Sequence, residues 1–375
     1  MVGQEKMTCP GERHNRSGFA PDVIRFMLIA GVSLALVLVF FAARAYRHPT
    51  GIVILEGDWT RELDREIGFV PVKNGSSRMR NLFAGLSYDI FTDDRGGRVN
   101  SPGLKAPGRV DLLTLGCSFA WGQGVDNRNT YTERLGRRLG LAVENLAVPE
   151  YGTVQSLLML ERNAALKPRV VVYGIIEDHL RRNLSPCVED FYARRCVPVP
   201  YVALGGGEDV FLHEAEPERV SMEEIRKYYR ESLVETYPSL NSALWQIRRD
   251  YNAVVNGLRH RYKNDVETRS KSIDVLLRRM NAECRGLGAR FVVVFIPYLR
   301  KEQHSAAPAE LIKALKGRKV PFLDLTAAVN QHYKRGGGPL HFEKDDHPNE
   351  AAHALIAVEL EKFMRRNRLL RRSLP

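Results

Sequence analysis

The polarity pattern changes along the chain and separates two kinds of structure. Residues 46–108 mix polar residues with glycine, proline, asparagine and aspartate, which predicts a loop-rich lead-in with short strands. From residue 109 onward, short apolar runs alternate with segments of helical periodicity. This alternation predicts a parallel sheet covered by helices on both faces, which is a three-layer α/β/α sandwich.

Apolar runs mark the expected strands of that sheet. They cover residues 110–116, 142–148, 168–176, 289–297 and 319–326. Helices are expected over 130–140, 153–167 and 349–367. Residues 183–220 are expected to be irregular, and the charged residues 221–288 are expected to form a helical insertion in an α/β domain spanning 109–375.

An uncharged apolar run at residues 26–43 predicts a further element. As a helix it would span about 27 Å, close to the thickness of a bilayer's hydrocarbon core. We therefore expect a single inner-membrane anchor over 23–45, and a cytoplasmic tail over 1–22 because basic residues precede the run. The remaining chain would be periplasmic or extracellular. A cleaved signal peptide is the alternative, although the run is longer than a usual signal core.

Charge and cysteine content narrow the possible partners. The formal net charge of +12 suits anionic lipid or an acidic polymer, and no zinc-finger or RNP-like motif favours nucleic acid. Cys187 and Cys196 close a short polar loop, which predicts a disulfide in an oxidising compartment. No CxxC pair occurs, so a structural zinc site is not expected. No cofactor is expected either. The oligomeric state stays open.

One serine stands where a catalytic group could lie. In "LLTLGCSFAWGQGV", residues 112–125, Ser118 follows the first strand of the sheet. A serine at a sharp strand-to-helix turn is exposed near free backbone N–H groups and serves as a nucleophile in some hydrolases. A helix N-cap serine is the alternative interpretation.

A histidine near the C-terminus could serve as the base for Ser118. In "DDHPNEAAH", His347 follows two carboxylates, and Pro348 forces it into an extended conformation before the last helix. A neighbouring carboxylate holds a catalytic imidazole in the required tautomer. The alternative is an acidic surface loop with an incidental histidine.

The two motifs together resemble those of the SGNH/GDSL hydrolase superfamily. The resemblance implies a flavodoxin-like sheet, a Ser–His–Asp site, and hydrolysis or transfer of acyl esters. It places Ser118 at the nucleophile and His347 at the base. Asp345 matches the family's D-x-H spacing and would orient His347.

Two further segments resemble the family's blocks but depart from them. In "NLAVPEYGTVQ", Glu150 stands where glycine is usual and Gly152 is retained, and the oxyanion hole would use the N–H of Glu150. In "YGIIEDHLRRN", Glu177 and Asp178 stand where Asn-Asp is usual. An ionised Glu177 donates no hydrogen bond to an oxyanion.

Three hypotheses follow from this second departure. Glu177 could be protonated in a dry pocket and act as a donor. His179, or an arginine of the same segment, could replace the missing donor. Otherwise the site could bind a ligand without catalysis.

The sequence therefore predicts a membrane-anchored serine esterase or O-acyltransferase that faces the periplasm. Its expected substrates are acyl esters, acetyl esters first, of a cell-envelope glycan or lipid. The alternative is a catalytically silent binding module that holds glycan or acyl ligands.

Overall fold

The computed structural model describes most of the chain and divides it into two units. The described residues are 25–33, 35–36, 39, 53–58, 60–81, 84–190, 195–204, 210–213, 266–301, 306–316 and 318–370. One unit comprises Met1–Thr50 with Tyr237–Ala253, and the other comprises Gly51–Thr236 with Val254–Pro375.

The first unit is described mainly by one helical stretch. Residues 25–33 are helical, and the side chains of Phe26, Met27, Leu28 and Ile29 are exposed. No helix in the described part of the chain is both long and apolar enough to cross a membrane. Several positions of the apolar run 26–43, and the whole of the expected tail 1–22, lie outside the described residues. The anchor over 23–45 stays a prediction.

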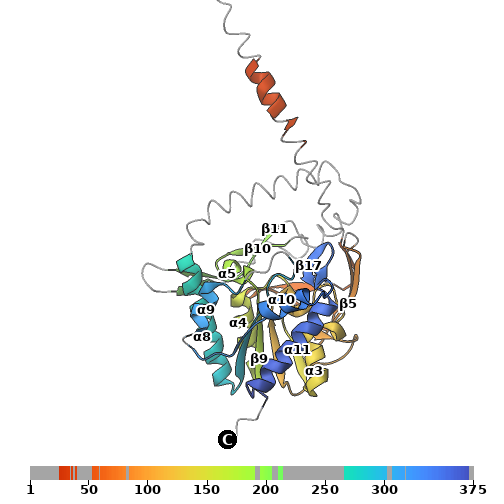
Figure 1. Cartoon of the computed structure of the whole chain (residues 1–375), viewed down its shortest axis with the longest axis vertical. Coiled ribbons are helices and arrows are strands. Elements are labelled where there is room, and N and C mark those ends of the chain that lie inside the picture. The colour runs from red at the N-terminus through yellow and green to blue at the C-terminus, as the bar shows by residue number, and fades with distance from the viewer. Residues whose placement is uncertain are drawn as a thin grey trace, which may run out of the picture. The chain divides into compact units, whose positions relative to one another are not determined.

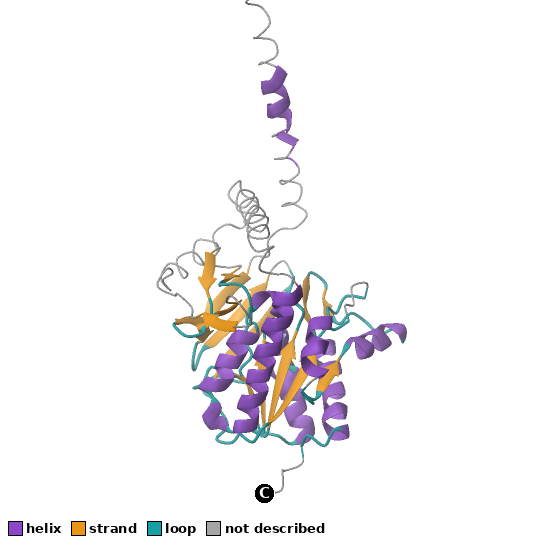
Figure 2. Ribbon diagram, turned by 90° about the vertical axis from the view of Figure 1, so that its left-hand side faces the viewer, coloured by secondary structure: helices purple, strands orange, loops and turns teal. Residues whose placement is uncertain are grey.

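The second unit is built around a five-stranded parallel sheet (Figures 1 and 2). Its strands are β7 (Leu112–Gly116), β8 (Val143–Asn145), β9 (Val170–Ile175), β14 (Arg290–Phe295) and β15 (Phe322–Asp324). They lie in the order β15-β14-β9-β7-β8, and each neighbouring pair is parallel. In chain order this is 2-1-3-4-5, the flavodoxin-like arrangement. The predicted three-layer α/β sandwich with a parallel sheet is confirmed.

Helices cover both faces of this sheet because successive strand residues point to opposite sides. On one face Leu115, Tyr173 and Phe295 belong to a core shared with α4 (Thr153–Arg162), α8 (Val266–Gly286) and α9 (Ala309–Lys316). On the other face the core is shared with α3 (Tyr131–Leu139) and α11 (Glu350–Arg366). The central strands β7, β9 and β14 are buried between these layers, which explains their apolar runs.

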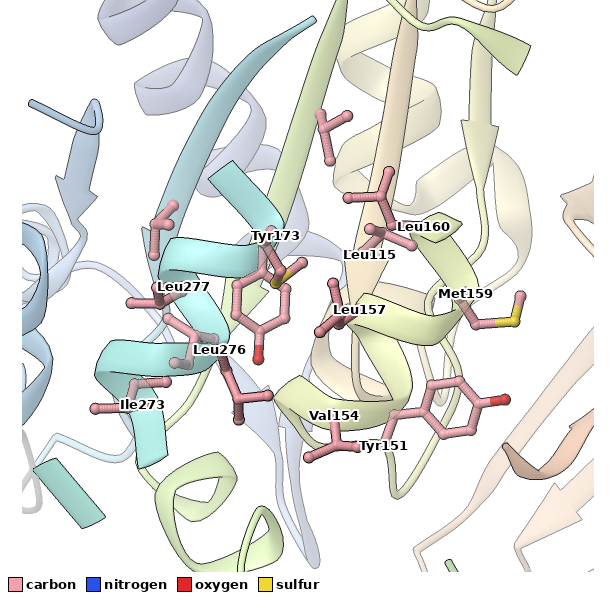
Figure 3. Close-up of a cluster of buried hydrophobic side chains, with 14 of the residues drawn as sticks. Leu115, Tyr151, Val154, Leu157, Met159, Leu160, Tyr173, Ile273, Leu276 and Leu277 are labelled. Carbon is pink, nitrogen blue, oxygen red and sulfur yellow. The ribbon is translucent and has the colours of Figure 1, made fainter. Parts of the chain in front are cut away.

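Helix α8 corrects part of the expected insertion. Its residues Ile273, Leu276 and Leu277 are buried against α4 and the sheet (Figure 3). Because α8 leads directly into β14, it is the crossover helix between β9 and β14 and part of the sandwich core. The rest of the expected insertion, residues 221–265, lies outside the described residues.

The segment expected to be irregular also contains regular structure. Strands β10 (Cys187–Asp190) and β11 (Arg195–Pro198) pair antiparallel, as do β12 (Tyr201–Leu204) and β13 (Val210–His213). Val188, Val197 and Val202 are buried in the main core. Strands of four residues are too short to show a period in the sequence, so tertiary burial decides their conformation. Cys187 is disulfide-bonded, and its predicted pairing with Cys196 stays a prediction.

The lead-in contains the short strands expected of it. A four-stranded antiparallel sheet joins β1 (Val53–Gly57), β4 (Ser76–Asn81), β5 (Leu86–Thr92) and β6 (Arg98–Val99), and β2 (Arg61–Asp64) pairs with β3 (Gly68–Pro71). Met79, Tyr88 and Ile90 are buried in the same core as residues following β7. The lead-in therefore packs onto the α/β sandwich.

Short elements complete the described fold and lie near the ends of the strands. They are α2 (Ser118–Trp121), η1 (Asn127–Asn129), η2 (Ala164–Leu166), α5 (Asp178–Arg182), α10 (Thr326–Lys334), β16 (His341–Phe342) and β17 (Asp345–Pro348). Ligand sites of open parallel sheets form beyond the carboxyl ends of the strands. Both α2 and α5 begin within three residues of such an end.

Candidate active site

The turn after β7 presents Ser118 at the start of α2. Gly116 has a φ of +143°, and a Cβ there would lie 2.5 Å from the carbonyl oxygen of Gly174. Only glycine fits this close approach of two strands. Cys117 takes the N-cap position without a side-chain capping bond, and Ser118 is the first helical residue. The alternative interpretation of Ser118 as a helix N-cap is therefore wrong.

The Ser118 hydroxyl belongs to a continuous chain of hydrogen bonds. Its Oγ lies 2.8 Å from Nε2 of His347, and Nδ1 of His347 lies 2.5 Å from Oδ1 of Asp345. Since an ionised carboxylate only accepts, Nδ1 carries the proton and Nε2 is the acceptor for the serine hydroxyl. The structure thus brings together all three residues expected to form a Ser–His–Asp site.

Local backbone structure fixes this relay. Strand β17 pairs with β16, and Oδ1 of Asp345 also accepts the backbone N–H of His347 at 2.8 Å. The ring of Phe119 packs against the imidazole, with centroids 5.4 Å apart. Burial alone would raise the pKa of Asp345, but hydrogen bonds from the imidazole and backbone of His347 hold it below its usual value. Asp345 is therefore ionised at neutral pH.

The second loop of the site carries Glu150 in a strained conformation. Its φ is +73°, in the left-handed region that favours glycine. This is the position at which the family resemblance expects glycine. The loop keeps the backbone shape that a glycine would adopt, at a cost of about 1–2 kcal/mol for a residue with a Cβ. The N–H of Glu150 and that of Ser118 are the candidate oxyanion donors.

An arginine of α5 supports that loop. Arg182 donates from Nη1 to the carbonyl oxygen of Tyr151 at 3.1 Å, and its Nη2 lies 3.7 Å from carboxylate oxygens of both Glu150 and Asp178. Burial alone would lower the pKa of Arg182, but the Glu150 carboxylate and other nearby groups hold it above its usual value. The charge of Glu150, new relative to the family pattern, is therefore balanced within the site.

Gly152 shapes the start of α4. Its N–H donates to Oε1 of Gln155 at 2.9 Å, and a Cβ at this position would lie 3.0 Å from Oδ1 of Asn183. The retained glycine therefore lets α5 approach the loop closely.

Glu177 follows the carboxyl end of β9 and is exposed to solvent. It borders a small depression that is otherwise lined by Phe119, Ile176, Phe295, Ile296 and Tyr298. The hypothesis of a dry pocket around Glu177 is wrong because water reaches its side chain. Asp178 is half-buried and faces Arg181 and Arg182.

His179 lies in the core, not at the cleft. It is fully buried, and its Nδ1 is 2.6 Å from the hydroxyl of Tyr173, which in turn donates to Thr153. Burial, with a smaller contribution from Arg182, holds the pKa of His179 well below its usual range. The structure therefore does not bring this neutral imidazole together with Ser118.

Arg98 of the lead-in holds the turn that carries Ser118, a role that no local pattern predicts. Its guanidinium donates to the carbonyl oxygens of Trp121, Gly122 and Val125 at 2.8–3.1 Å and lies 4.3 Å from the centre of the Trp121 ring. It is 4% exposed, and burial lowers its pKa to about 10. An arginine in the polar segment "GGRVN" is expected at the surface. Only the tertiary structure shows that Arg98 is buried and binds the turn of Ser118.

Among the described residues, no group of three or more histidine, cysteine, aspartate or glutamate side chains is arranged to hold a metal ion. The free cysteines of the described chain, Cys117 and Cys284, are buried. Burial raises the pKa of the Cys117 thiol, which keeps it protonated beside Ser118.

Comparisons with known proteins identify similar folds. No protein-family profile matches the chain, and no curated protein matches it by sequence. Similar solved structures include the psychrotrophic esterase EstA from Pseudoalteromonas sp., at 10% identity over 68% of this chain and 96% of that chain, TM-score 0.37.

Two further structures are similar to the same extent. An acetylxylan esterase from Geobacillus stearothermophilus is 12% identical over 70% of this chain and 96% of its own, TM-score 0.36. An alpha/beta hydrolase from the metagenome of Lake Arreo, Spain, is 11% identical over 71% and 98%, TM-score 0.36. The strand order and the hydrogen-bonded relay given above, and not these similarities, define the fold and the site.

Proposed function

We propose that the chain is a serine esterase or O-acyltransferase of the SGNH/GDSL type. The observation that carries the proposal is the relay from Ser118 Oγ to His347 Nε2 and from His347 Nδ1 to Asp345. Its parts come from two chain regions, after β7 and before α11, that only the fold brings together. A nucleophile, a base and an orienting carboxylate in this geometry are the requirements of acyl transfer.

The chemistry follows from the positions of these groups. His347 Nε2 takes the hydroxyl proton as Ser118 Oγ bonds to the ester carbonyl carbon, and the oxyanion faces the N–H groups of Ser118 and Glu150. His347 then returns the proton to the departing alkoxide, and the carbon–oxygen bond of the ester breaks. Water or a sugar hydroxyl, deprotonated by the same imidazole, resolves the acyl-enzyme and regenerates the serine.

Location and substrate are part of the proposal. Exposed apolar side chains on the helical stretch 25–33 support a membrane anchor, with the second unit in the periplasm. The net charge of +12 suits an anionic cell-envelope glycan or lipid as the carrier of the acyl ester. We thus propose such an ester as the substrate.

The test is replacement of Ser118 in the full chain. Ser118→Ala should abolish hydrolysis of p-nitrophenyl acetate and butyrate, whereas Ser87→Ala, at an exposed position of β5, should leave it unchanged. Turnover by Ser118→Ala equal to that of the unmodified chain would exclude Ser118 as the nucleophile.

One observation favours a second function, a catalytically silent binding module. The exposed Glu177 carboxylate stands where an oxyanion donor is expected, and loss of one donor costs about 10²–10³ in kcat. A fluorophosphonate probe separates the two functions. Labelling that is lost in Ser118→Ala supports the enzyme, and absence of labelling at high probe concentration supports the silent module.

A further inference from the structure

Two buried carboxyl groups meet where the lead-in packs against the edge of the parallel sheet. Asp93 follows β5 of the lead-in, and Glu144 lies in β8, the edge strand. The two residues are 1% and 3% exposed. A Cβ at Gly97 would lie 2.4 Å from Oε1 of Glu144 and 3.1 Å from Oδ2 of Asp93, so both oxygens face the same glycine. Neither oxygen accepts a hydrogen bond from a donor group in the described part of the chain.

One proton satisfies both of these oxygens. Two ionised carboxylates only accept hydrogen bonds and repel each other, which is costly in a buried contact. When one of them is protonated, its O–H donates to the other, and each oxygen gains a partner. Oδ1 of Asp93 accepts the backbone N–H groups of Arg95 and Gly97 at 2.8 and 2.9 Å, which favours the charged form of Asp93. The shared proton therefore belongs to Glu144.

The surroundings of Glu144 keep this proton in place at neutral pH. Burial, and then the Asp93 carboxyl to which Glu144 is hydrogen-bonded, raise the pKa of Glu144 to about 8. Within the same turn, Arg95 opposes this rise and Asp94 adds to it. Asp111, which precedes the neighbouring strand β7, is paired with two arginines. Glu144 is therefore neutral at pH 7 and loses its proton in the mildly alkaline range.

The carboxyl pair is joined on both sides to the turn that carries Ser118. On the lead-in side, the chain continues into Arg98, whose guanidinium binds the carbonyl oxygens of that turn. On the sheet side, Glu144 is followed by Asn145, whose Nδ2 donates to the carbonyl oxygen of Ala120 at 3.2 Å. Ala120 belongs to α2, the helix that begins at Ser118. Separation of the lead-in from β8 would therefore displace Arg98 from this helix.

We propose that Glu144 is a positioning residue whose proton, shared with Asp93, keeps the lead-in on β8 and holds the turn of Ser118 in its reactive conformation. Loss of the proton leaves two negative charges in a buried contact, so the lead-in separates from β8 and the contacts of Arg98 with the turn loosen. Acyl transfer thereby becomes sensitive to mildly alkaline pH. The inference rests on the proposed function for this kinetic consequence, but its effect on stability does not depend on catalysis.

The kinetic experiment measures kcat of the full chain for p-nitrophenyl butyrate as a function of pH, with spontaneous hydrolysis subtracted. In the unmodified chain kcat should fall about tenfold between about pH 7 and about pH 9, because the protonated fraction of Glu144 falls by that factor. Glu144→Gln keeps a donor toward Asp93 and cannot ionise, so this decline should disappear. Glu62→Gln, the same change at an exposed position of β2, is the matched control and should keep the decline.

A second variant approaches the pair from the other side. In Asp93→Asn the amide can donate to the Glu144 carboxylate, so the alkaline decline in kcat should disappear there as well. A merely structural role would lower kcat equally at every pH and leave the shape of the profile unchanged. A decline that survives in either folded variant would overturn the proposal, and so would an unmodified chain without any decline.

Thermal unfolding keeps the inference separate from catalysis. Because folding raises the pKa of Glu144, its contribution to stability is complete below about pH 4.5 and is lost as the pH rises to about 8. The melting temperature of Glu144→Gln should equal that of the unmodified chain near about pH 5 and exceed it by about 5 °C near about pH 8. If no chain hydrolyses the ester but the melting temperatures diverge in this way, the proposed function fails and the shared proton is supported. A constant difference in melting temperature over this range would overturn it.

Discussion

The two halves of the candidate site differ in how their polar groups are satisfied. On the relay side, Ser118, His347 and Asp345 are joined by short hydrogen bonds, and the imidazole is held by Phe119. On the oxyanion side, Glu150 occupies a left-handed conformation, and Glu177 is exposed where a donor is expected. The relay is closed by direct hydrogen bonds, whereas the loop of Glu150 is held by the longer contact of its carboxylate with Arg182.

The two halves of the site therefore differ in the substitutions that they tolerate. The relay depends on side chains that must keep their chemical identity, so substitution destroys it. The oxyanion hole depends mainly on backbone N–H groups, which every residue except proline supplies. Position 150 can therefore carry glutamate in place of glycine if the surrounding structure compensates the strain and the charge of the glutamate. Arg182 compensates the charge.

The largest effect is expected on the relay side. Asp345→Asn should lower kcat by about 10⁴, because an amide can donate to Nδ1 and favours the tautomer in which Nε2 cannot accept the serine proton. Steady-state kinetics with p-nitrophenyl butyrate measures the loss. Asp346→Asn, at the neighbouring carboxylate that pairs with Arg300, is the control and should remain near the unmodified rate. A loss below tenfold for Asp345→Asn would contradict its orienting role.

A smaller effect of the opposite sign is expected at Glu177. Glu177→Asn should raise kcat by about 10–100-fold, because it supplies the missing donor and removes a negative charge from the mouth of the site. Glu177→Ala separates the two contributions, since it removes the charge without adding a donor. If Glu177→Asn is slower than the unmodified chain, the carboxylate has a role of its own and the oxyanion side is complete as it stands.

The smallest effect concerns the strain of the loop. Glu150→Gly should be more stable than Glu150→Ala by about 1 kcal/mol, because glycine adopts a φ of +73° without steric cost and loses part of that gain to chain entropy. Comparing these two variants cancels the lost ion pair with Arg182. Denaturant unfolding of both variants gives the difference. Equal stabilities would mean that the loop relaxes and that the strain at Glu150 is absent in solution.

The sequence predicted the sheet and the relay because both depend on local signals. The five strands follow from apolar runs, and Ser118 and His347 stand out by their positions after the first strand and before the last helix. The resemblance to SGNH/GDSL hydrolases is what pairs them with each other and with Asp345. The oxyanion side was less predictable. Exposure of Glu177 and burial of His179 are decided by the path of α5, which is only five residues long and leaves no periodic pattern.

The packing of two larger elements cannot be predicted from the local pattern. Helix α8 carries many charged residues, and this composition predicts a helical insertion outside the core. Its narrow apolar stripe, with Ile273, Leu276 and Leu277, nevertheless packs into the core. The strands of the lead-in are short and rich in glycine and polar residues, so their packing against Trp121 left no sign in the sequence. In both cases long-range contacts override the local pattern.

The buried guanidinium of Arg98 has a consequence for where the functional unit begins. A boundary at residue 108, natural from composition, would separate the nucleophile turn from the group that binds its carbonyl oxygens. Strand β6, which carries Arg98, therefore belongs to the same structural unit as the turn of Ser118. Engineering that transplants residues 109–375 alone would carry Ser118 without the guanidinium that binds the carbonyl oxygens of its turn.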